Sequence, residues 1–141
     1  MLAQWDRNEA REVGTIDELD ALLDDLDRIS RDQILPYAVA IWTGERENGD
    51  DGYSLTLVVG TETSPVQWTC PGPPYSRASW NGGSDEEPCF ATNYGGERTD
   101  LDAWMPIPIA DAREAARRFF ATGGACPDNL TWEPEAERST R

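Results

Sequence analysis

The sequence contains no histidine and no lysine, and these two absences restrict its chemistry. Without His there is no Ser-His-Asp triad, no Cys-His nucleophile pair and no His ligand for zinc. The 12 basic residues are all Arg and face 27 acidic residues, so the formal net charge at pH 7 is −15. This charge disfavours direct binding to nucleic acid or to an anionic membrane surface, because both would repel the chain.

Long apolar runs and paired cysteines are also missing. No stretch approaches the ~20 apolar residues of a membrane span, and residues 1–13 lack the basic-then-apolar form of a signal peptide. Cys70, Cys89 and Cys126 form no Cys-x-x-Cys pair, so a Cys-rich zinc or redox motif is absent. An odd number of cysteines without a signal peptide favours reduced thiols in the cytoplasm, as small side chains in or near a core. A disulfide between two of them stays open, with no support from the sequence.

Two amphipathic helices are predicted. Thr15 and Glu18 form a capping box at the start of the first helix, and apolar residues recur at three- and four-residue steps through residues 16–30. The second helix has Asp111 to cap and charge its start, and the glycine pair 123–124 to end it.

Short apolar or alternating segments between and after these helices predict strands. They lie at residues 37–42, 53–60, 66–69, 75–80, 89–94 and 130–133. The order of helix, several strands, helix and last strand indicates an α+β fold. We expect an antiparallel sheet of about five to six strands, with the two helices packed on one face.

The length of 141 residues fits one domain. Residues 1–14 are polar and predict a loose N-terminal lead-in, which Trp5 could anchor. Residues 15–133 form the single predicted domain. Residues 134–141 are polar and predict a disordered tail.

No residue pattern predicts catalysis, a cofactor or a metal site. The acidic turn at residues 48–52 lacks the alternating acids and the bidentate Glu of a calcium loop, so it indicates a solvated hairpin turn. The glycine pairs 82–83 and 95–96 lack the spacing of phosphate-binding loops. Cys89 could act as a nucleophile only with a base or a lowered pKa, and there is no His to activate it.

The loops carry the candidate partner-binding residues. Trp80 and Tyr94 lie beside glycine-rich turns, where they could be lids over the core or binding hot spots. The full set of candidates is Asp50, Asp51, Trp80, Asp85, Glu86, Glu87 and Tyr94. Acidic groups beside aromatics suit a basic partner, such as a nucleic-acid-binding enzyme, whose groove would accept carboxylates in place of phosphates.

The order of several segments resembles a known family. They are 15–24, 55–60, 66–68, 93–96, 107–115 and 119–124, followed by Trp132. Each segment alone is weakly specific, but the ordered set is similar to the first-numbered immunity-protein family of bacterial polymorphic toxin systems.

The resemblance implies a protein that binds and silences a toxin domain made by the same or a sibling cell. Members of the family are often encoded beside toxins of the cytidine-deaminase superfamily, including those that act on double-stranded DNA. Such toxins use a zinc-bound water and a Glu, with His and Cys ligands. Since this chain has no His, it would be the inhibitor, and its partner would be the cognate toxin domain.

Two other classes remain open at this point. One is an acidic adaptor or nucleic-acid mimic with a partner that is not a toxin, and a toxin gene next to this one would argue against it. The other is an enzyme that uses carboxylates or a Cys. The sequence leaves the oligomeric state open.

Overall fold

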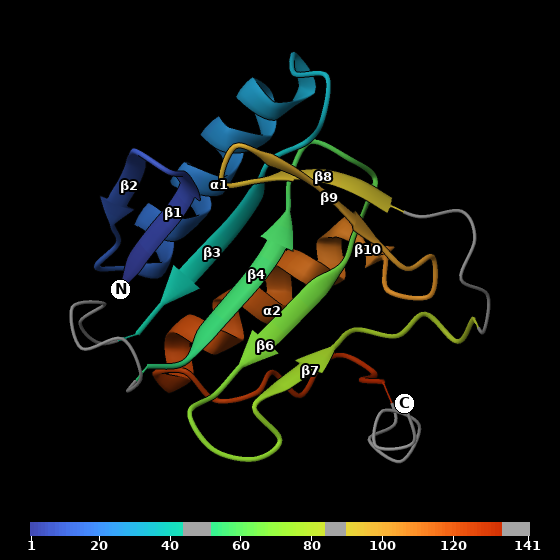
Figure 1. The fold of residues 1–141 in the computed structure, drawn as a ribbon. Helices are drawn as coiled ribbons and strands as arrows, with labels where there is room; N and C mark the ends of the chain where they lie inside the picture. Colours follow the sequence, from blue (N-terminus) through green and yellow to red (C-terminus); the bar gives the residue numbers. More distant parts are fainter. Residues whose placement is uncertain (44–51, 84–89, 134–141) are drawn as a thin grey trace.

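The computed structural model describes residues 1–43, 52–83 and 90–133. A six-stranded antiparallel sheet forms its centre (Figure 1). The strands, in spatial order, are β2 (Glu9–Glu12), β1 (Leu2–Asp6), β3 (Ala38–Trp42), β4 (Ser54–Val58), β6 (Val66–Thr69) and β7 (Ser76–Ala78). This confirms the predicted α+β class and the predicted number of strands in the sheet. Within the described ranges, no helix is long and apolar enough to cross a membrane.

Helix α1 (Ile16–Arg31) follows the predicted capping and periodicity. The Thr15 hydroxyl accepts a hydrogen bond from the Glu18 backbone N–H at 3.1 Å, which satisfies one of the free donors of the first turn. The four leucines of the predicted stripe are buried, but Ile29 is 46% exposed. Ser30 takes the last buried position of the helix instead.

Helix α2 (Ile109–Thr122) starts two residues before Asp111, so Asp111 lies in the first turn and does not cap the helix. Pro108 occupies the N-cap position, without a side-chain hydrogen bond. The predicted end is confirmed, because Gly123 adopts the left-handed conformation (φ 75°) and its N–H bonds back to the last turn.

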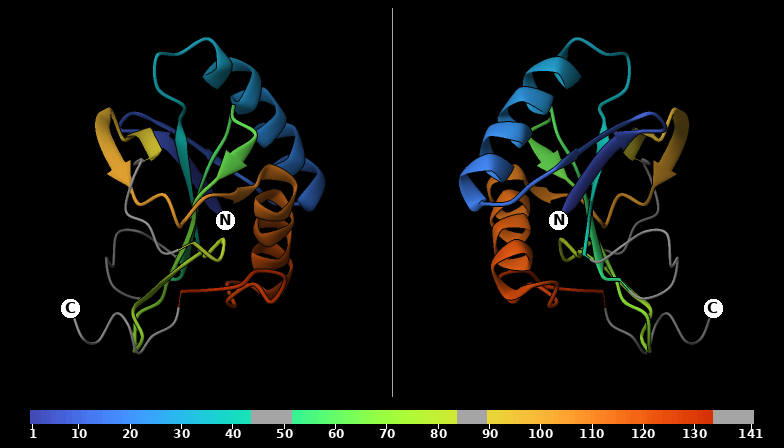
Figure 2. Two further views of the ribbon diagram at one scale, coloured as in Figure 1. Left: turned by 90° about the vertical axis from the view of Figure 1, so that its right-hand side faces the viewer. Right: turned by 90° about the vertical axis from the view of Figure 1, so that its left-hand side faces the viewer.

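Both helices pack on the same face of the sheet, as predicted (Figure 2). The core lies between them and the strands. It contains the leucines of α1, Phe119 and the alanines of α2, and the inward residues of β3, β4 and β6. No helix of the described ranges lies on the opposite face of the sheet.

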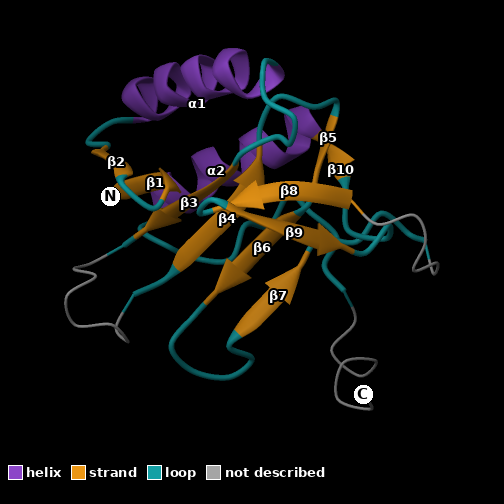
Figure 3. Ribbon diagram, turned by 45° about the horizontal axis from the view of Figure 1, so that its top comes forward, coloured by secondary structure: helices purple, strands orange, loops and turns teal. Residues whose placement is uncertain are grey.

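A separate hairpin crosses that opposite face (Figure 3). Strands β8 (Phe90–Tyr94) and β9 (Glu97–Leu101) pair with each other and not with the large sheet. Gly95 and Gly96 both have positive φ (63° and 95°), which permits the tight turn between β8 and β9. The remaining strands, β5 (Thr63–Ser64) and β10 (Ile107–Pro108), form a short pair.

The prediction for the N-terminus was wrong. Residues 2–12 are a hairpin of the main sheet, and β1 lies between β2 and β3. The prediction of a strand at 130–133 holds only in part, because this segment makes a single bridge from Trp132 to Ser79. The predicted tail, 134–141, lies outside the described residues.

Ser30, in the last turn of α1, links this helix to the residue just before β3 and to the residue just after β4. Its hydroxyl donates to the Val59 carbonyl at 2.7 Å and accepts from the Tyr37 N–H at 2.8 Å. The side chain is buried, so these bonds replace water for two backbone groups. Gly60 (φ 93°) passes directly over it, and a Cβ there would lie 2.7 Å from the Ser30 Oγ.

Candidate functional site

The sheet face opposite the helices is the candidate binding surface, and strand register defines its residues. Residues directly opposed in an antiparallel pair point to the same side of the sheet. One cross-strand row on this side is Glu12, Leu2, Trp42, Ser54, Thr69 and Ser76. The next row is Ala10, Gln4, Ala40, Thr56, Gln67 and Ala78. We call these two rows, with Ala38 and Val58 beyond them, the open face; Figure 1 looks onto it, with α2 behind.

The open face has almost no charge. Only Glu12, on the edge strand, is charged, although 28% of the residues in the sequence are. Burial accounts for only part of this: Ala38, Ala40, Ser54, Val58 and Ala78 are buried, but Gln67 and Thr69 are exposed to solvent. A sheet surface that only meets water usually carries polar and charged residues. The open face instead combines small or neutral polar residues with Trp42.

The β8–β9 hairpin is fixed over one end of the open face by backbone contacts. The Asn93 N–H and the Thr92 hydroxyl both donate to the Pro36 carbonyl, each at 2.8 Å. A parallel bridge also joins Asn93 to Tyr37, just before β3. These bonds hold the hairpin against the sheet at its β8 strand.

Two grooves lie where the hairpin meets the open face. The apolar groove has a volume of about 230 Å³ and is lined by Ala38, Thr56, Val58, Pro65, Val66, Gln67, Thr92, Tyr94, Thr99, Leu101 and Met105. The turn groove has a volume of about 480 Å³ and is lined by Gln4, Trp5, Asp6, Arg7, Ala38, Ala40, Trp42, Tyr94 and Gly95. Both grooves include Ala38 and Tyr94, so they are neighbours on the same surface.

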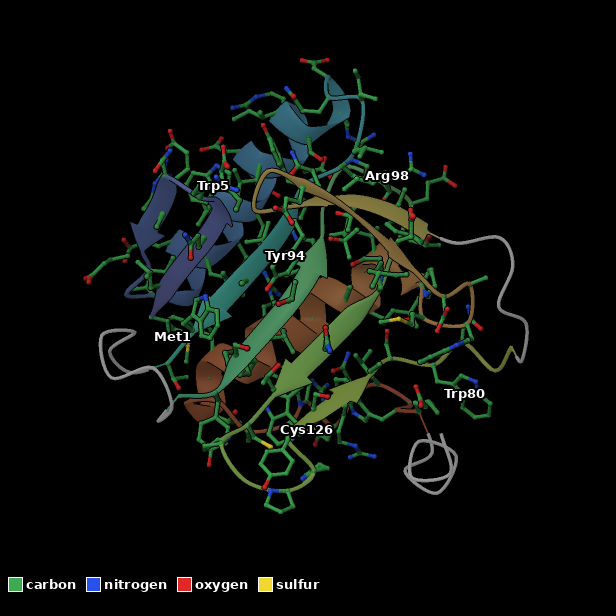
Figure 4. The ribbon with its side chains drawn as sticks, in the orientation of Figure 1. Met1, Trp5, Trp80, Tyr94, Arg98 and Cys126 are labelled. Atoms are coloured by element: carbon green, nitrogen blue, oxygen red, sulfur yellow. The ribbon has the colours of Figure 1, made fainter. Side chains whose placement is uncertain are left out.

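Tyr94 is the predicted candidate that the structure places at this surface. It ends β8, lines both grooves and is 46% exposed (Figure 4). An accessible Tyr between two grooves has the position of a binding anchor, since Tyr offers a rigid apolar ring and a polar tip.

Trp80 lies elsewhere, well apart from Tyr94 in Figure 4. Its ring packs against the small cluster of Ala78, Trp104 and Met105, and its indole N–H donates to the Gly83 carbonyl at 2.7 Å. Trp80 lines a third groove together with residues around Pro108 and Asn129. The structure therefore does not bring the two aromatic candidates into one site, and Trp80 covers the cluster of Ala78, Trp104 and Met105.

The five acidic candidates are not among the described residues. Asp50 and Asp51 follow β3 within residues 44–51, and Asp85, Glu86 and Glu87 precede β8 within residues 84–89. Their role stays a prediction.

Much of the acidity of α1 is compensated inside the protein. Arg113 donates to the Asp24 carboxylate at 2.6 Å, and Arg117 holds the Asp20 carboxylate through its Nε at 3.0 Å. The hydrogen bond from Arg117 is the main cause of a lowered pKa of Asp20, and the positive charges of Arg117 and Arg113 add to it. These ion pairs join the two helices on the side away from the open face.

Acids near the open face are less compensated. Among the described residues, Asp6, Glu12 and Glu97 form no ion pair with an Arg. Asp6 accepts the Arg7 backbone N–H at 2.6 Å, and a Cβ on Gly96 would lie 3.8 Å from its Oδ1. The turn of the N-terminal hairpin and the turn of β8–β9 therefore lie close together at the rim of the turn groove.

Analysis of the sequence missed most of this surface. Gln4 and Trp5 were assigned to a lead-in, while Ala40, Thr56 and Gln67 looked like ordinary outward strand positions. One signal in the sequence could have indicated them. In the predicted strands 37–42 and 53–60, the positions that point away from the core also carry no charge, although the chain is highly charged.

The described residues hold no group of three or more Cys, Asp or Glu that could bind a metal. Cys70 is buried in the main core, and Cys126 is partly buried, which raises the pKa of its thiol. Cys89 lies outside the described residues. The cysteines that can be placed are free thiols at the core, as the simpler interpretation expected.

Comparison with known proteins places the chain in a family. Among curated proteins, no match was found. A family model described as immunity protein Imm1 matches residues 7–134, from the turn after β1 to just past the last described residue. The match thus includes every residue of the open face except Leu2 and Gln4 of β1. The chain belongs to the Imm1 family of immunity proteins.

Proposed function

We propose that this immunity protein inhibits a toxin that acts on nucleic acid, of the cytidine-deaminase type, by covering the active site of the toxin with an acidic surface. Membership of the family makes the chain an immunity protein, and immunity proteins bind a cognate toxin. The observation that carries the finer proposal is the net charge of −15. A toxin that must attract phosphates has a basic groove, which an acidic protein can occupy.

The distribution of charge supports a localised contact. Ion pairs with Arg113 and Arg117 compensate two of the α1 acids, whereas Asp6, Glu12 and Glu97 remain available around the open face. Uncompensated carboxylates exert a stronger attraction on a basic partner than paired ones do.

The proposed action is binding and not catalysis. An immunity protein must hold its toxin tightly, since one free toxin molecule turns over repeatedly. Dissociation constants from nanomolar to picomolar correspond to about 12–16 kcal/mol of binding free energy. A few buried aromatic anchors and a charged rim are the usual source of such affinity.

Co-expression with the toxin domain encoded beside this gene tests the proposal. We expect cell survival, co-purification of a complex, and loss of cytidine deamination on DNA when purified immunity protein is added in equimolar amount. A neighbouring toxin without deaminase activity would contradict the proposed toxin class. A complex that still deaminates DNA would contradict the proposed covering of the active site.

A further inference from the structure

The open face has the composition of the centre of a protein interface. Among the described residues, the β8–β9 hairpin covers one end of it and Trp104 and Met105 pack on Ala78, while Gln67 and Thr69 between them are exposed. Interface centres are depleted in charge and enriched in aromatic residues, and charged groups gather at the rim. Trp42 and Tyr94 supply the aromatics, and Ala40 and Thr56 leave hollows beside them. Asp6, Glu12 and Glu97 form an acidic rim, and Arg7 lines the turn groove beside Asp6.

We propose that the open face is the surface that binds the toxin, and that a loop of the toxin with an apolar tip between Arg or Lys residues enters the turn groove beside Tyr94. This inference rests on the proposed function and adds to it the place and chemistry of the contact. The apolar tip would fill the hollow over Ala40, and the basic residues would meet the acidic rim.

The size of the surface agrees with this. Six strands at a spacing of about 4.8 Å make the open face roughly 24 Å wide. A stable interface covers about 800 Å² on each partner, which is a patch roughly 28 Å across. The sheet is therefore similar in width to such a patch, of which the β8–β9 hairpin with Trp104 and Met105 already covers a part.

Charge favours a toxin over a second copy of this chain. Two copies that met through their open faces would bring together the same acidic rims, and each molecule carries a net charge of −15. Like charges across an interface are unfavourable, whereas a basic partner would be attracted.

Matched substitutions of two glutamines test the site. Gln67 is exposed on the open face, and Gln33 is exposed after α1 on another part of the surface. Gln67→Arg and Gln33→Arg make the same change in size and charge. The partner in the assay is the neighbouring toxin domain with its catalytic Glu replaced. We expect Gln67→Arg to weaken binding at least tenfold by calorimetry or surface plasmon resonance, and Gln33→Arg to change it less than twofold.

A second pair of variants tests the anchor. Tyr94→Ala removes the ring between the two grooves and should speed dissociation at least tenfold. Tyr75→Ala removes another exposed aromatic, 61% exposed, on the loop between β6 and β7, and should leave dissociation unchanged. Circular dichroism and melting temperature confirm that each variant is folded before its binding is compared.

The outcomes separate the two proposals. If the unchanged protein does not bind the toxin domain, the proposed function fails, and this inference fails with it. If it binds and the Gln67 and Gln33 variants bind equally, the open face is not the site, while the proposed function stands. A photo-crosslinking amino acid at position 67 that captures the toxin, together with none captured from position 33, would support the open face without relying on affinity.

Discussion

At the scale of single residues, Ser30 shows how a small buried side chain can hold a fold together. It lies in the last turn of α1 and bonds to Val59, just after β4, and to Tyr37, just before β3. The hydroxyl stabilises the fold because the Val59 carbonyl that it serves is buried away from water and the Tyr37 N–H is partly so.

Ser30→Ala should therefore lower the free energy of unfolding by about 1–3 kcal/mol, since it leaves a carbonyl and an N–H buried without partners. Urea denaturation measures the change. Ser76→Ala is the matched control, because Ser76 is only partly buried and its side chain makes no hydrogen bond within the described residues. Equal effects of the two substitutions would show that Ser30 is not the connection described here.

At the scale of elements, the two helices are joined by ion pairs as well as by their apolar faces. Asp20 is the centre of this contact, with Arg117 and Arg113 reaching it from α2. Its side chain is 22% exposed and that of Arg117 is 48% exposed, so solvent screens the pair and its contribution is modest.

The contact should depend on pH in a defined direction. The pKa of Asp20 is lowered in the folded protein below its ordinary value of 3.8, so its contribution is complete above pH 3.8 and is lost as the pH falls through the folded value. Arg117→Gln should lower the free energy of unfolding slightly at pH 7, because solvent screens the pair. The stability curves of the two proteins should converge below pH 3.8.

Arg28→Gln provides the comparison for this test. It removes an exposed pair with Asp25 within one helix, which should change stability by less than about 0.5 kcal/mol. If the Arg117 variant lost the same stability at pH 7 and at pH 2, the bond to Asp20 would not be the cause of its effect.

The sequence predicted the helices better than the outer strands, and the reason is physical. The leucines of α1 repeat because one face must be buried, so their spacing is visible. All four residues of β2 are exposed, so burial imposes no alternation there and the strand cannot be distinguished from a loop. Its place in the sheet depends on backbone hydrogen bonds to β1, which composition does not reveal.

At the scale of the whole molecule, the charge has two roles. Some of the carboxylates form ion pairs with Arg between and along the helices, and the unpaired ones can attract a basic partner. The surface itself was hidden from sequence reasoning, because the open face combines residues from six strands and depends on a register that no short segment encodes.

The acidic loop before β8 gives a test of long-range attraction. Asp85→Asn, Glu86→Gln and Glu87→Gln together should slow association with the toxin domain about 3- to 10-fold at low salt, and the difference should shrink as salt rises. Stopped-flow fluorescence at several ionic strengths measures both effects.

The control for this test removes three charges from α1 and its end, through Asp17→Asn, Asp25→Asn and Asp32→Asn. If both triple variants slow association equally, only the net charge of the molecule matters. If neither slows it, the acidity has no part in encounter.

The position of β1 has a consequence for folding order. Each pair of neighbours in the large sheet is close along the chain, except β1 and β3, which are separated by β2 and all of α1. Pairings between close segments form early, because they lose less chain entropy on closure. We therefore expect the N-terminal hairpin to dock last and to open first in native-state hydrogen exchange. Since Gln4 and Asp6 line the turn groove, a bound toxin would slow amide exchange in this hairpin more than in the central strands.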